Sequence, residues 1–321
     1  MYDEEVLRMN KVAFVFPGQG SQYIGMGKDL HEKYEVAGKI FNEFDFIMEK
    51  NLSNLCFEGT EEDLKQTINS QSAILAVSIA AYEVLKSKCN IVPDYLAGHS
   101  LGEYTALYAA GVINLPEIIK LVQKRAELMN EAPTGSMTAI LGMDDDKLQQ
   151  IIQEASSAGI ICAANYNTPD QTVISGETIA VEKANELAKE LGAKRVIPLA
   201  VSGGFHSPLM KPIAEKFEKY VNNTNVNDAG IPVVTNVDAR STVDKAEFSS
   251  KMIKQIYSSV YWKQTINYMV EQGVDTFIEI GPGKVLSGMI RKICKTANVY
   301  NVYNVESLEK TLSECVTEVG V

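Results

Sequence analysis

The sequence predicts an α/β protein in which a small α+β domain is inserted into a larger domain built on a parallel sheet. Apolar stretches typical of buried parallel strands alternate with helical stretches over most of the chain. Between residues 136 and 201 the elements follow a different order. A length of 321 residues exceeds what one hydrophobic core usually accommodates, so we expect two structural units.

The first expected strand of the larger domain, 12–16, is apolar and ends at the glycine-rich loop 17–22. This loop has neither the Gly-Lys-Ser/Thr of a P-loop nor the spaced glycines of a dinucleotide site, so no nucleotide is expected there. Helices follow around 27–50, 61–67 and 71–88, and a strand at 91–97 leads into a helix at 103–110. The larger domain resumes with a helix from about 210, strands at 232–236 and 276–280, and a helix after Gly281-Pro282-Gly283.

The inserted segment has its own order of elements. Its expected strands are 137–142, 160–164, 172–175 and 195–201, with helices at 145–158 and 178–191. The resulting order, β-α-β-β-α-β, is the ferredoxin-like arrangement. We therefore predict a ferredoxin-like small domain at 136–201 and a discontinuous larger domain made of 1–135 and 202–321.

Gly98-His99-Ser100-Leu101-Gly102 lies between the expected strand and the helix at 103–110. A serine on such a turn has a strained backbone and an exposed hydroxyl, and the flanking glycines leave room for the bend. The helix that follows points backbone N–H groups and its positive dipole end at a group bonded to the serine. The motif predicts an acyl-enzyme nucleophile, Ser100, and an α/β-hydrolase-like larger domain.

A serine nucleophile needs a base, and the chain has three histidines. His31 lies in a polar helical stretch and is expected to be a solvated surface residue. His99 adjoins Ser100, so its side chain should leave the turn on another side and pack near the site. His206 lies in a loop between a strand and a helix, where α/β folds display catalytic side chains. We therefore predict a Ser100–His206 dyad.

Arg125 falls on the apolar face of its helix, seven residues after Ile118 and four after Leu121. A guanidinium there needs an anionic partner, because an unpaired buried charge is costly. The partner is either an acidic side chain of this protein or the carboxylate of a substrate, which arginine binds through two parallel hydrogen bonds. The spacing alone favours neither interpretation.

Composition limits the class of protein. The formal net charge of −11 without a basic tract argues against a nucleic-acid partner. No apolar run approaches membrane-spanning length, and the acidic start does not have the pattern of a signal peptide. The five scattered cysteines fit reduced thiols in the cytoplasm rather than disulfides or a zinc site. No coiled-coil pattern suggests obligate assembly, so we expect a monomer.

Several ordered motifs indicate a family. They are 16–22, 98–104, Arg125 at its spacing from Ser100, 165–169, 201–208, 236–238 and 280–286. With these motifs, the chain from Met9 to about Ile293 closely resembles bacterial malonyl-CoA:acyl carrier protein transacylases of type II fatty acid synthesis. Residues 1–8 precede the usual start of this family, so Met9 is an alternative beginning of the natural protein.

The resemblance implies a role for each matching residue. Ser100 would be the nucleophile and His206 its general base. Arg125 would bind the malonyl carboxylate, and Gln19 with the Leu101 N–H would form the oxyanion hole.

The resemblance also implies residues that line the substrate site. Asn165 would line it from the small domain, His99 would pack beside it, and Phe205 would disfavour an α-methyl group on the acyl chain. A backbone carbonyl in the loop 259–262 would orient His206. The family often has Pro-Val-x-Trp in that loop, where this chain has Ser-Val-Tyr-Trp.

The activity implied by the resemblance is ping-pong transfer of a malonyl group. The group passes from malonyl-CoA to Ser100 and then to the phosphopantetheine thiol of acyl carrier protein, without a metal or redox cofactor. Carrier proteins of this kind are acidic, as is this chain, so transient docking requires a local basic patch. The candidate docking residues are Lys284, Arg291, Lys292 and Lys295, or Lys189, Lys194 and Arg195 on the small domain. Fatty-acid and polyketide pathways both remain open.

Two other functions fit part of this sequence pattern. An esterase or thioesterase of the α/β-hydrolase type has the same serine turn, but usually places its acid and histidine late in the chain. An arginine on the apolar face would also serve a hydrolase poorly. A catalytically inactive docking module is the second alternative, and the presence of Ser100, His206, Arg125 and Gln19 together argues against it.

Overall fold

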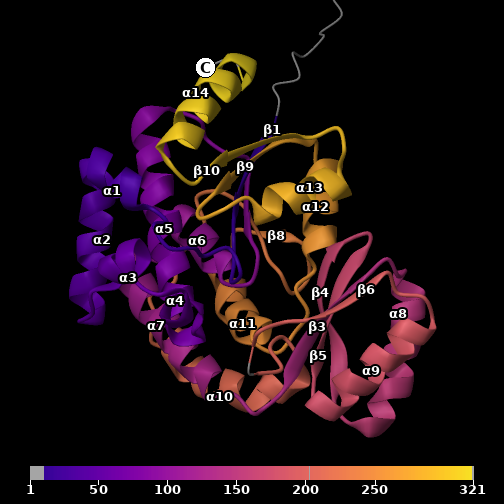
Figure 1. Cartoon of the computed structure of the whole chain (residues 1–321). Helices are drawn as coiled ribbons and strands as arrows, with labels where there is room; N and C mark the ends of the chain where they lie inside the picture. Colours follow the sequence, from indigo (N-terminus) through magenta and orange to yellow (C-terminus); the bar gives the residue numbers. More distant parts are fainter. Residues whose placement is uncertain (1–10, 202, 320–321) are drawn as a thin grey trace, which may run out of the picture.

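The computed structural model describes residues 11–201 and 203–319, so residues 1–8 and the alternative start at Met9 lie outside the described part. Two sheets organise this part of the chain (Figure 1). The strands of the larger sheet are β1 (Lys11–Phe16), β2 (Tyr95–Gly98), β7 (Val233–Val234), β8 (Ser241–Thr242), β9 (Val274–Ile280) and β10 (Asn298–Val302). Those of the smaller sheet are β3 (Ser136–Leu141), β4 (Ile161–Thr168), β5 (Gln171–Gly176) and β6 (Arg195–Pro198).

The larger sheet is parallel except at one edge. Its strand order is β10-β9-β1-β2-β7-β8, and only the short β7–β8 pairing is antiparallel. The central strand β1 is buried from its second residue onward, as expected for a run of apolar residues covered by helices on both faces. The predicted α/β class with a parallel sheet is therefore confirmed. Since β1 and β2 are neighbours, their carboxyl ends place the loop after Phe16 beside the turn after Gly98.

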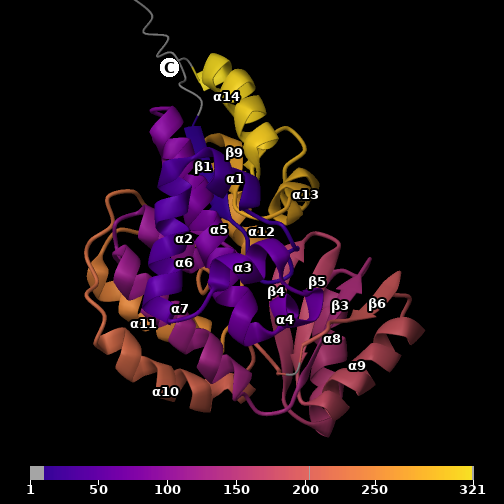
Figure 2. The same ribbon diagram turned by 60° about the vertical axis from the view of Figure 1, so that its left-hand side comes forward.

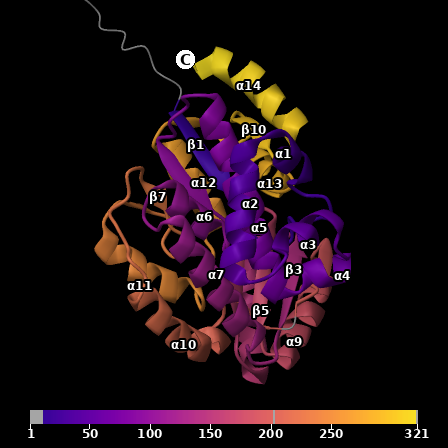
Figure 3. The ribbon, with the colours of Figure 1, turned by 90° about the vertical axis from the view of Figure 1, so that its left-hand side faces the viewer.

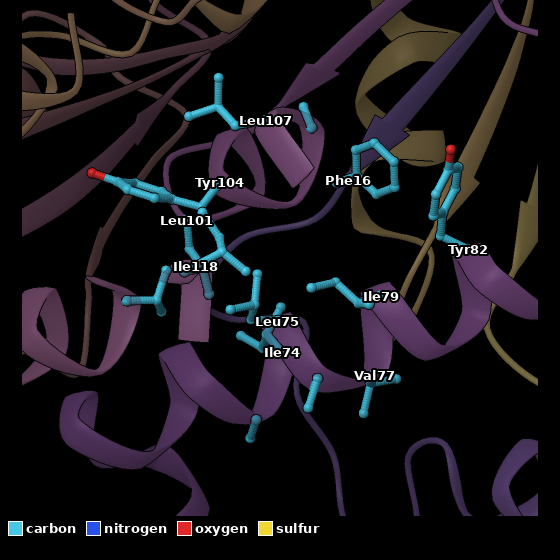
Figure 4. Close-up of a cluster of buried hydrophobic side chains, with 14 of the residues drawn as sticks. Phe16, Ile74, Leu75, Val77, Ile79, Tyr82, Leu101, Tyr104, Leu107 and Ile118 are labelled. Atoms are coloured by element: carbon cyan, nitrogen blue, oxygen red, sulfur yellow. The ribbon is translucent and has the colours of Figure 1, made fainter. Parts of the chain in front are cut away.

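Helices of the first half pack around this sheet. They are α1 (Lys28–Lys33), α2 (Glu35–Met48), α3 (Leu52–Glu58), α4 (Glu61–Lys65), α5 (Thr67–Lys88), α6 (Gly102–Ala109) and α7 (Leu115–Asn130). Figure 4 shows Phe16 of β1, Leu101 before α6 and Leu75 of α5 in one buried cluster. The serine turn is thus anchored in the largest hydrophobic core of the described chain.

Helix α5 requires a correction to the expectation that no apolar run approaches membrane-spanning length. It has 22 residues, and by length and composition it is the one helix in the described ranges that could cross a membrane. However, 83 % of its most apolar window is buried inside the fold. Its low amphipathicity follows from this position, because neighbouring helices surround it on most sides.

The segment from β3 to β6 forms a separate lobe, at the lower right in Figures 1 and 2. Its sheet is antiparallel in the order β4-β5-β3-β6. Helices α8 (Asp145–Ala155) and α9 (Thr178–Glu190) cover the face of this sheet that points away from the rest of the molecule, with a short 3-10 turn at Ser156–Ala158. The lobe has its own apolar core, which includes Ile140, Leu148, Ile174 and Val181.

The chain then returns to the larger sheet. It forms a 3-10 turn at Pro208–Met210, followed by α10 (Lys211–Asn222), α11 (Lys245–Gln255), α12 (Trp262–Glu271), α13 (Val285–Ile293) and α14 (Val305–Val319). Figure 3 shows α14 at the end of the molecule opposite to α9 and α10.

The predicted elements are present with shifted boundaries. The stretch expected to be helical around 27–50 contains two helices, since Tyr34 adopts an extended conformation and separates α1 from α2. Strands β2, β6 and β7 are shorter than predicted. The elements β8, β10, α3, α11, α12 and α14 were not predicted.

Candidate active site

The turn between β2 and α6 holds Ser100 in a left-handed backbone conformation, with φ of 51°. Two glycines make this turn possible. A Cβ on Gly98 would lie 1.9 Å from the Gly102 carbonyl carbon, and one on Gly102 would lie 2.0 Å from the Phe16 carbonyl oxygen. Any side chain at either position would therefore push the serine out of place.

The side chain of Asn236 brackets this turn from the end of the neighbouring strand β7. Its Oδ1 accepts the Ser100 N–H at 2.8 Å, and its Nδ2 donates to the Gly98 carbonyl at 2.7 Å. The next N–H along the chain, that of Leu101, meets no acceptor within the described residues. One N–H at the start of α6 is thus used to hold the serine, and the following one is available to a ligand.

His206 lies beside the serine. Its Nε2 is 2.8 Å from the Ser100 Oγ, and its Nδ1 is 2.9 Å from the Gln255 carbonyl oxygen, which acts as an acceptor when Nδ1 carries the proton. Burial, together with the nearby Arg125 charge, lowers the pKa of His206 to about 3. At neutral pH the imidazole is uncharged, so Nε2 can accept a proton from the serine hydroxyl.

The carbonyl that orients His206 is not in the loop 259–262, where it was expected. That loop makes a different connection, because Val260 donates to the Ala164 carbonyl at 2.8 Å and accepts from the Tyr166 N–H at 3.0 Å. It thereby joins β4 of the small sheet to the larger unit. Gln255, at the end of α11 and four residues before this loop, orients the histidine instead.

Arg125 of α7 is 1 % exposed. Its guanidinium donates to the Ser100 Oγ and the Gln255 Oε1, both at 3.2 Å, and also to the Gln71 Oε1. Its Cζ lies 5.2 Å from the centre of the Tyr104 ring. Burial lowers the pKa of Arg125, but a guanidinium remains protonated in proteins.

Arg125 forms no ion pair with any acidic side chain in the described ranges. Of the two interpretations open at the level of sequence, the geometry therefore favours a guanidinium available to an anionic ligand. The group lies behind the serine, at a distance where it can contact an acyl chain attached to Oγ.

A cavity of about 380 Å³ opens in front of the serine. Gln19, Ser100 and His206 line it from the larger unit, and Asn165 lines it from β4. The Gln19 side chain has one hydrogen bond, a long one of 3.4 Å from Nε2 to the Thr67 Oγ1. Gln19 can therefore turn its amide toward an oxygen bound at Ser100.

Other predicted residues lie close to the same cavity. Phe205 and His99 contribute to its wall. The His99 Nε2 is 2.9 Å from the Asn167 Oδ1, and its ring packs edge-on against Trp262, in agreement with a packing role beside the site. The prediction for His31 is wrong, because this ring is half-buried against Phe41 and Phe57 rather than solvated.

The predicted docking cations lie outside this cavity. Lys284 and Arg291 line a second, polar cavity of about 330 Å³ near α13 and α14. Lys292 pairs with Asp170 at 3.6 Å, and Lys295 is exposed. On the small lobe Lys189, Lys194 and Arg195 are exposed. Lys65, which was not predicted, lines the cavity at Ser100.

Metal and disulfide chemistry find no support in the described residues. No group of three or more histidine, cysteine, aspartate or glutamate side chains is placed there to hold a metal ion. Cys56, Cys89, Cys162 and Cys294 are free thiols, and the side chain of Cys315 lies outside the description. Burial raises the pKa of Cys56 and of Cys162 to about 12, which makes both poor nucleophiles.

Besides Lys65, three amide side chains of the site were missed at the level of sequence: Gln71, Asn236 and Gln255. Each reaches the site from an element far from Ser100 in sequence, and each is a neutral amide with no periodicity of its own. Asn236 carried a weak signal, since it belongs to one of the family motifs. The sequence offered no signal for the other two beyond a polar residue in an apolar helix at Gln71.

Comparison with known proteins identifies the family of this chain. The model of the acyl transferase domain family matches residues 13–316. The malonyl CoA-acyl carrier protein transacylase of Bacillus subtilis (strain 168) is 49 % identical over 313 residues, which cover 95 % of this chain and 98 % of that protein.

Solved structures are similar over almost the whole chain. An acyl carrier protein S-malonyltransferase from Vibrio cholerae has a TM-score of 0.91 and 42 % identity, over 94 % of this chain and all of that one. A malonyl-transacylase in complex with a type II PKS acyl-carrier protein has a TM-score of 0.92 and 39 % identity, over 95 % and 99 % of the two chains. The chain with the Ser100–His206 pair and the buried Arg125 belongs to the malonyl CoA-acyl carrier protein transacylase family.

Proposed function

We propose that this protein transfers a malonyl group from malonyl-CoA to the phosphopantetheine thiol of an acyl carrier protein, through a malonyl ester of Ser100. One observation carries the proposal. A single oxygen, the Ser100 Oγ, lies 2.8 Å from the His206 Nε2 and 3.2 Å from an Arg125 nitrogen. A base and a cation thus meet at a hydroxyl on a strained turn, as transfer of an acyl chain with a free carboxylate requires.

In the first half-reaction, His206 accepts the proton of Ser100 while Oγ forms a bond to the thioester carbonyl carbon. The resulting oxyanion is stabilised by the Gln19 amide and the Leu101 N–H, and such a donor typically contributes about 3–4 kcal/mol. The carbon–sulfur bond then breaks, and His206 returns its proton to the thiolate of coenzyme A. The Gln255 carbonyl keeps the imidazole in the required tautomer and orientation.

The second half-reaction runs in the opposite direction. The thiol of phosphopantetheine loses its proton to His206 and forms a bond to the ester carbon, after which the bond to Oγ breaks and Ser100 regains a proton. The reaction is ping-pong and its two half-reactions balance without a metal or redox cofactor. Water must be kept out of the cavity between them.

Substrate selection follows from the residues around the ester. The Arg125 guanidinium anchors the free malonyl carboxylate, while Phe205 disfavours a methyl group next to it. Asn165 and His99 complete the wall. An acetyl group would leave the buried guanidinium unpaired, and polar mismatches of this kind discriminate strongly between substrates.

We further propose that the fold combines an α/β-hydrolase-like domain (1–135 and 202–321) with an inserted ferredoxin-like domain (136–201). The strand–serine–helix turn on a mostly parallel sheet supports the first description. The order β-α-β-β-α-β with antiparallel sheet order β4-β5-β3-β6 supports the second. Expression of residues 136–201 alone would test these boundaries, which predict that the fragment folds.

The proposed state is a cytoplasmic monomer that binds the carrier protein transiently. Residues of one chain supply the dyad, the guanidinium and the cavity wall, so a second copy is not needed to complete the site. Free thiols support a reducing compartment. Sedimentation of the purified protein would test the oligomeric state.

The test of the function is an acyl survey followed by an acceptor assay. The protein is incubated with malonyl-, acetyl- and methylmalonyl-CoA, and adducts are located by mass spectrometry. We expect a malonyl adduct on Ser100, little of the other two, and transfer to the thiol of added carrier protein. Release of free malonate in place of transfer would favour the thioesterase, and the absence of any adduct would favour the inactive docking module.

A further inference from the structure

We propose that Gln71 and Gln255 form an amide cradle that holds Arg125 without neutralising its charge, so that the acyl carboxylate supplies the missing counter-ion. The inference deepens the proposed function and rests on it. It assigns substrate selection to two residues behind the guanidinium as well as to the guanidinium itself.

The cradle is built from three distant segments. Gln71 lies in the first turns of α5, Arg125 in the middle of α7 and Gln255 at the end of α11. Both glutamines are fully buried. Each turns its side-chain oxygen to a different terminal nitrogen of the guanidinium, Gln71 to Nη1 and Gln255 to Nη2. Two fixed oxygens on two nitrogens define the plane and position of the guanidinium.

The side chains that hold Arg125 are uncharged. The buried carboxylate of Glu103 on α6 does not pair with the guanidinium: its oxygen accepts the Asn236 N–H at 2.6 Å, and it interacts with the Gln255 side chain. Glu103 therefore attracts Arg125 only through space. An amide oxygen satisfies a hydrogen-bond donor but cannot balance a full charge, so the buried cation keeps most of its demand for an anion. A malonyl carboxylate meets that demand, and an acetyl group does not.

Gln71 is the sharper position for a test. Among the residues that the structure describes, its Nε2 donates only to the Met129 sulfur at 3.4 Å, a weak acceptor. Conversion to glutamate thus introduces a carboxylate beside Arg125 with little loss of other bonding. Gln255 is less suitable, because its Nε2 also holds the Ser100 carbonyl and Asn236.

The experiment compares Gln71→Glu with Gln71→Met, a matched control that removes the acceptor without adding charge. Initial rates of malonyl and acetyl loading from the two CoA esters are measured by intact-protein mass spectrometry. For Gln71→Glu we expect the ratio of malonyl to acetyl loading to fall by about 100-fold, because the protein supplies its own counter-ion. We expect the Tm to equal or exceed that of the unmodified protein. Gln71→Met should be slower with malonyl-CoA yet still prefer it to acetyl-CoA.

Two results would overturn the cradle. One is a folded Gln71→Glu protein with an unchanged malonyl-to-acetyl ratio. The other is loss of the folded state in Gln71→Glu but not in Gln71→Met, because a carboxylate beside an unbalanced buried guanidinium is expected to offset the cost of its own burial. If the unmodified protein itself forms no malonyl adduct, the proposed function fails, and the Tm comparison still decides whether the guanidinium lacks a counter-ion.

Discussion

Helices α13 and α6 each begin just after a strand of the larger sheet, β9 and β2 respectively. The N–H groups in their first turns differ in whether they have a hydrogen-bond acceptor. At the start of α13, the buried carboxylate of Glu279 accepts the N–H groups of Leu286 and Ser287, at 3.0 and 2.7 Å, and the Ser287 hydroxyl at 2.6 Å. At the start of α6, the Leu101 N–H meets no acceptor in the described ranges. The contrast shows that the first N–H groups of α13 are satisfied within the fold, whereas the start of α6 leaves a donor beside Ser100 that the proposed oxyanion can use.

The largest effect is expected when the Ser100 hydroxyl, which lies beside the free Leu101 N–H, is removed. Ser100→Ala should abolish the malonyl adduct and lower transfer by about 10⁴-fold or more, since within the described residues no other hydroxyl is hydrogen-bonded to the His206 Nε2. Intact-protein mass spectrometry measures the adduct, and an unchanged Tm shows that the turn is preserved. An adduct that persists in this variant would place the nucleophile elsewhere.

The next largest effect concerns the cation at the same turn. Arg125→Ala should lower kcat/KM for malonyl-CoA by about 1000-fold, equivalent to about 4 kcal/mol, because the carboxylate loses its buried partner. Acetyl loading should rise relative to malonyl loading. Steady-state rates with both CoA esters measure the change, and Arg125→Lys serves as a control that keeps the charge. Undiminished malonyl transfer in Arg125→Ala would refute the assignment of Arg125 to the malonyl carboxylate.

Gln19 is the side-chain donor proposed to act together with the free Leu101 N–H, so its removal tests the oxyanion hole. Gln19→Ala should lower kcat about 100-fold with little change in Tm, since Gln19 makes one long hydrogen bond in the fold. Lys65→Ala, at the wall of the same cavity, is the matched control and should retain most of kcat. Equal losses in the two variants would point to the shape of the cavity rather than to an oxyanion hole.

At the capped helix the expected effect is on stability. Glu279→Gln replaces an acceptor of three hydrogen bonds with a group that turns an NH₂ toward donors, so the free energy of unfolding should fall by about 1–3 kcal/mol. Urea unfolding measures this difference. Loading of Ser100 per folded molecule should match the unmodified protein, and a selective loss of loading would contradict the purely structural role of this helix start.

The smallest effect is expected at the far end of α13, where Arg291 is exposed. Arg291→Glu should raise the KM for acyl carrier protein several-fold, more so at low salt, and spare the KM for malonyl-CoA. Arg291 also donates to the Val299 carbonyl at 2.9 Å, so Arg291→Gln controls for the loss of that bond. Similar changes in both KM values would place the docking patch elsewhere, with Arg195 and Lys194 as the next candidates.

Much of this architecture follows from local sequence. The apolar run at 12–16, the Gly-x-Ser-x-Gly turn and the order of elements in 136–201 each predict their element because local periodicity and turn chemistry decide it. Arg125 was recognised because a charge on an apolar face is conspicuous. His206 could be predicted as the base because the chain has only two other histidines, His31 and His99.

The remainder depends on contacts that no local pattern encodes. Gln255 reaches His206, Arg125 and Ser100 at once, and only the packing of α11 brings it there. The two-residue strand β8 has too few residues to show alternation. The prediction for His31 failed because the polar sequence around it conceals two aromatic neighbours, Phe41 and Phe57.

The backbone pairing of Val260 with β4 has a mechanical consequence. Ser100, His206 and Arg125 all belong to the larger unit, whereas Asn165 stands on the opposite wall, between the two residues of β4 that bond to Val260. The Ser259 hydroxyl, which donates to the Ala163 carbonyl, and the Lys263–Asp145 ion pair join the same two units. The wall that carries Asn165 is therefore held in place relative to Ser100, and the width of the entrance is determined by this joint rather than by Ser100 and His206 themselves.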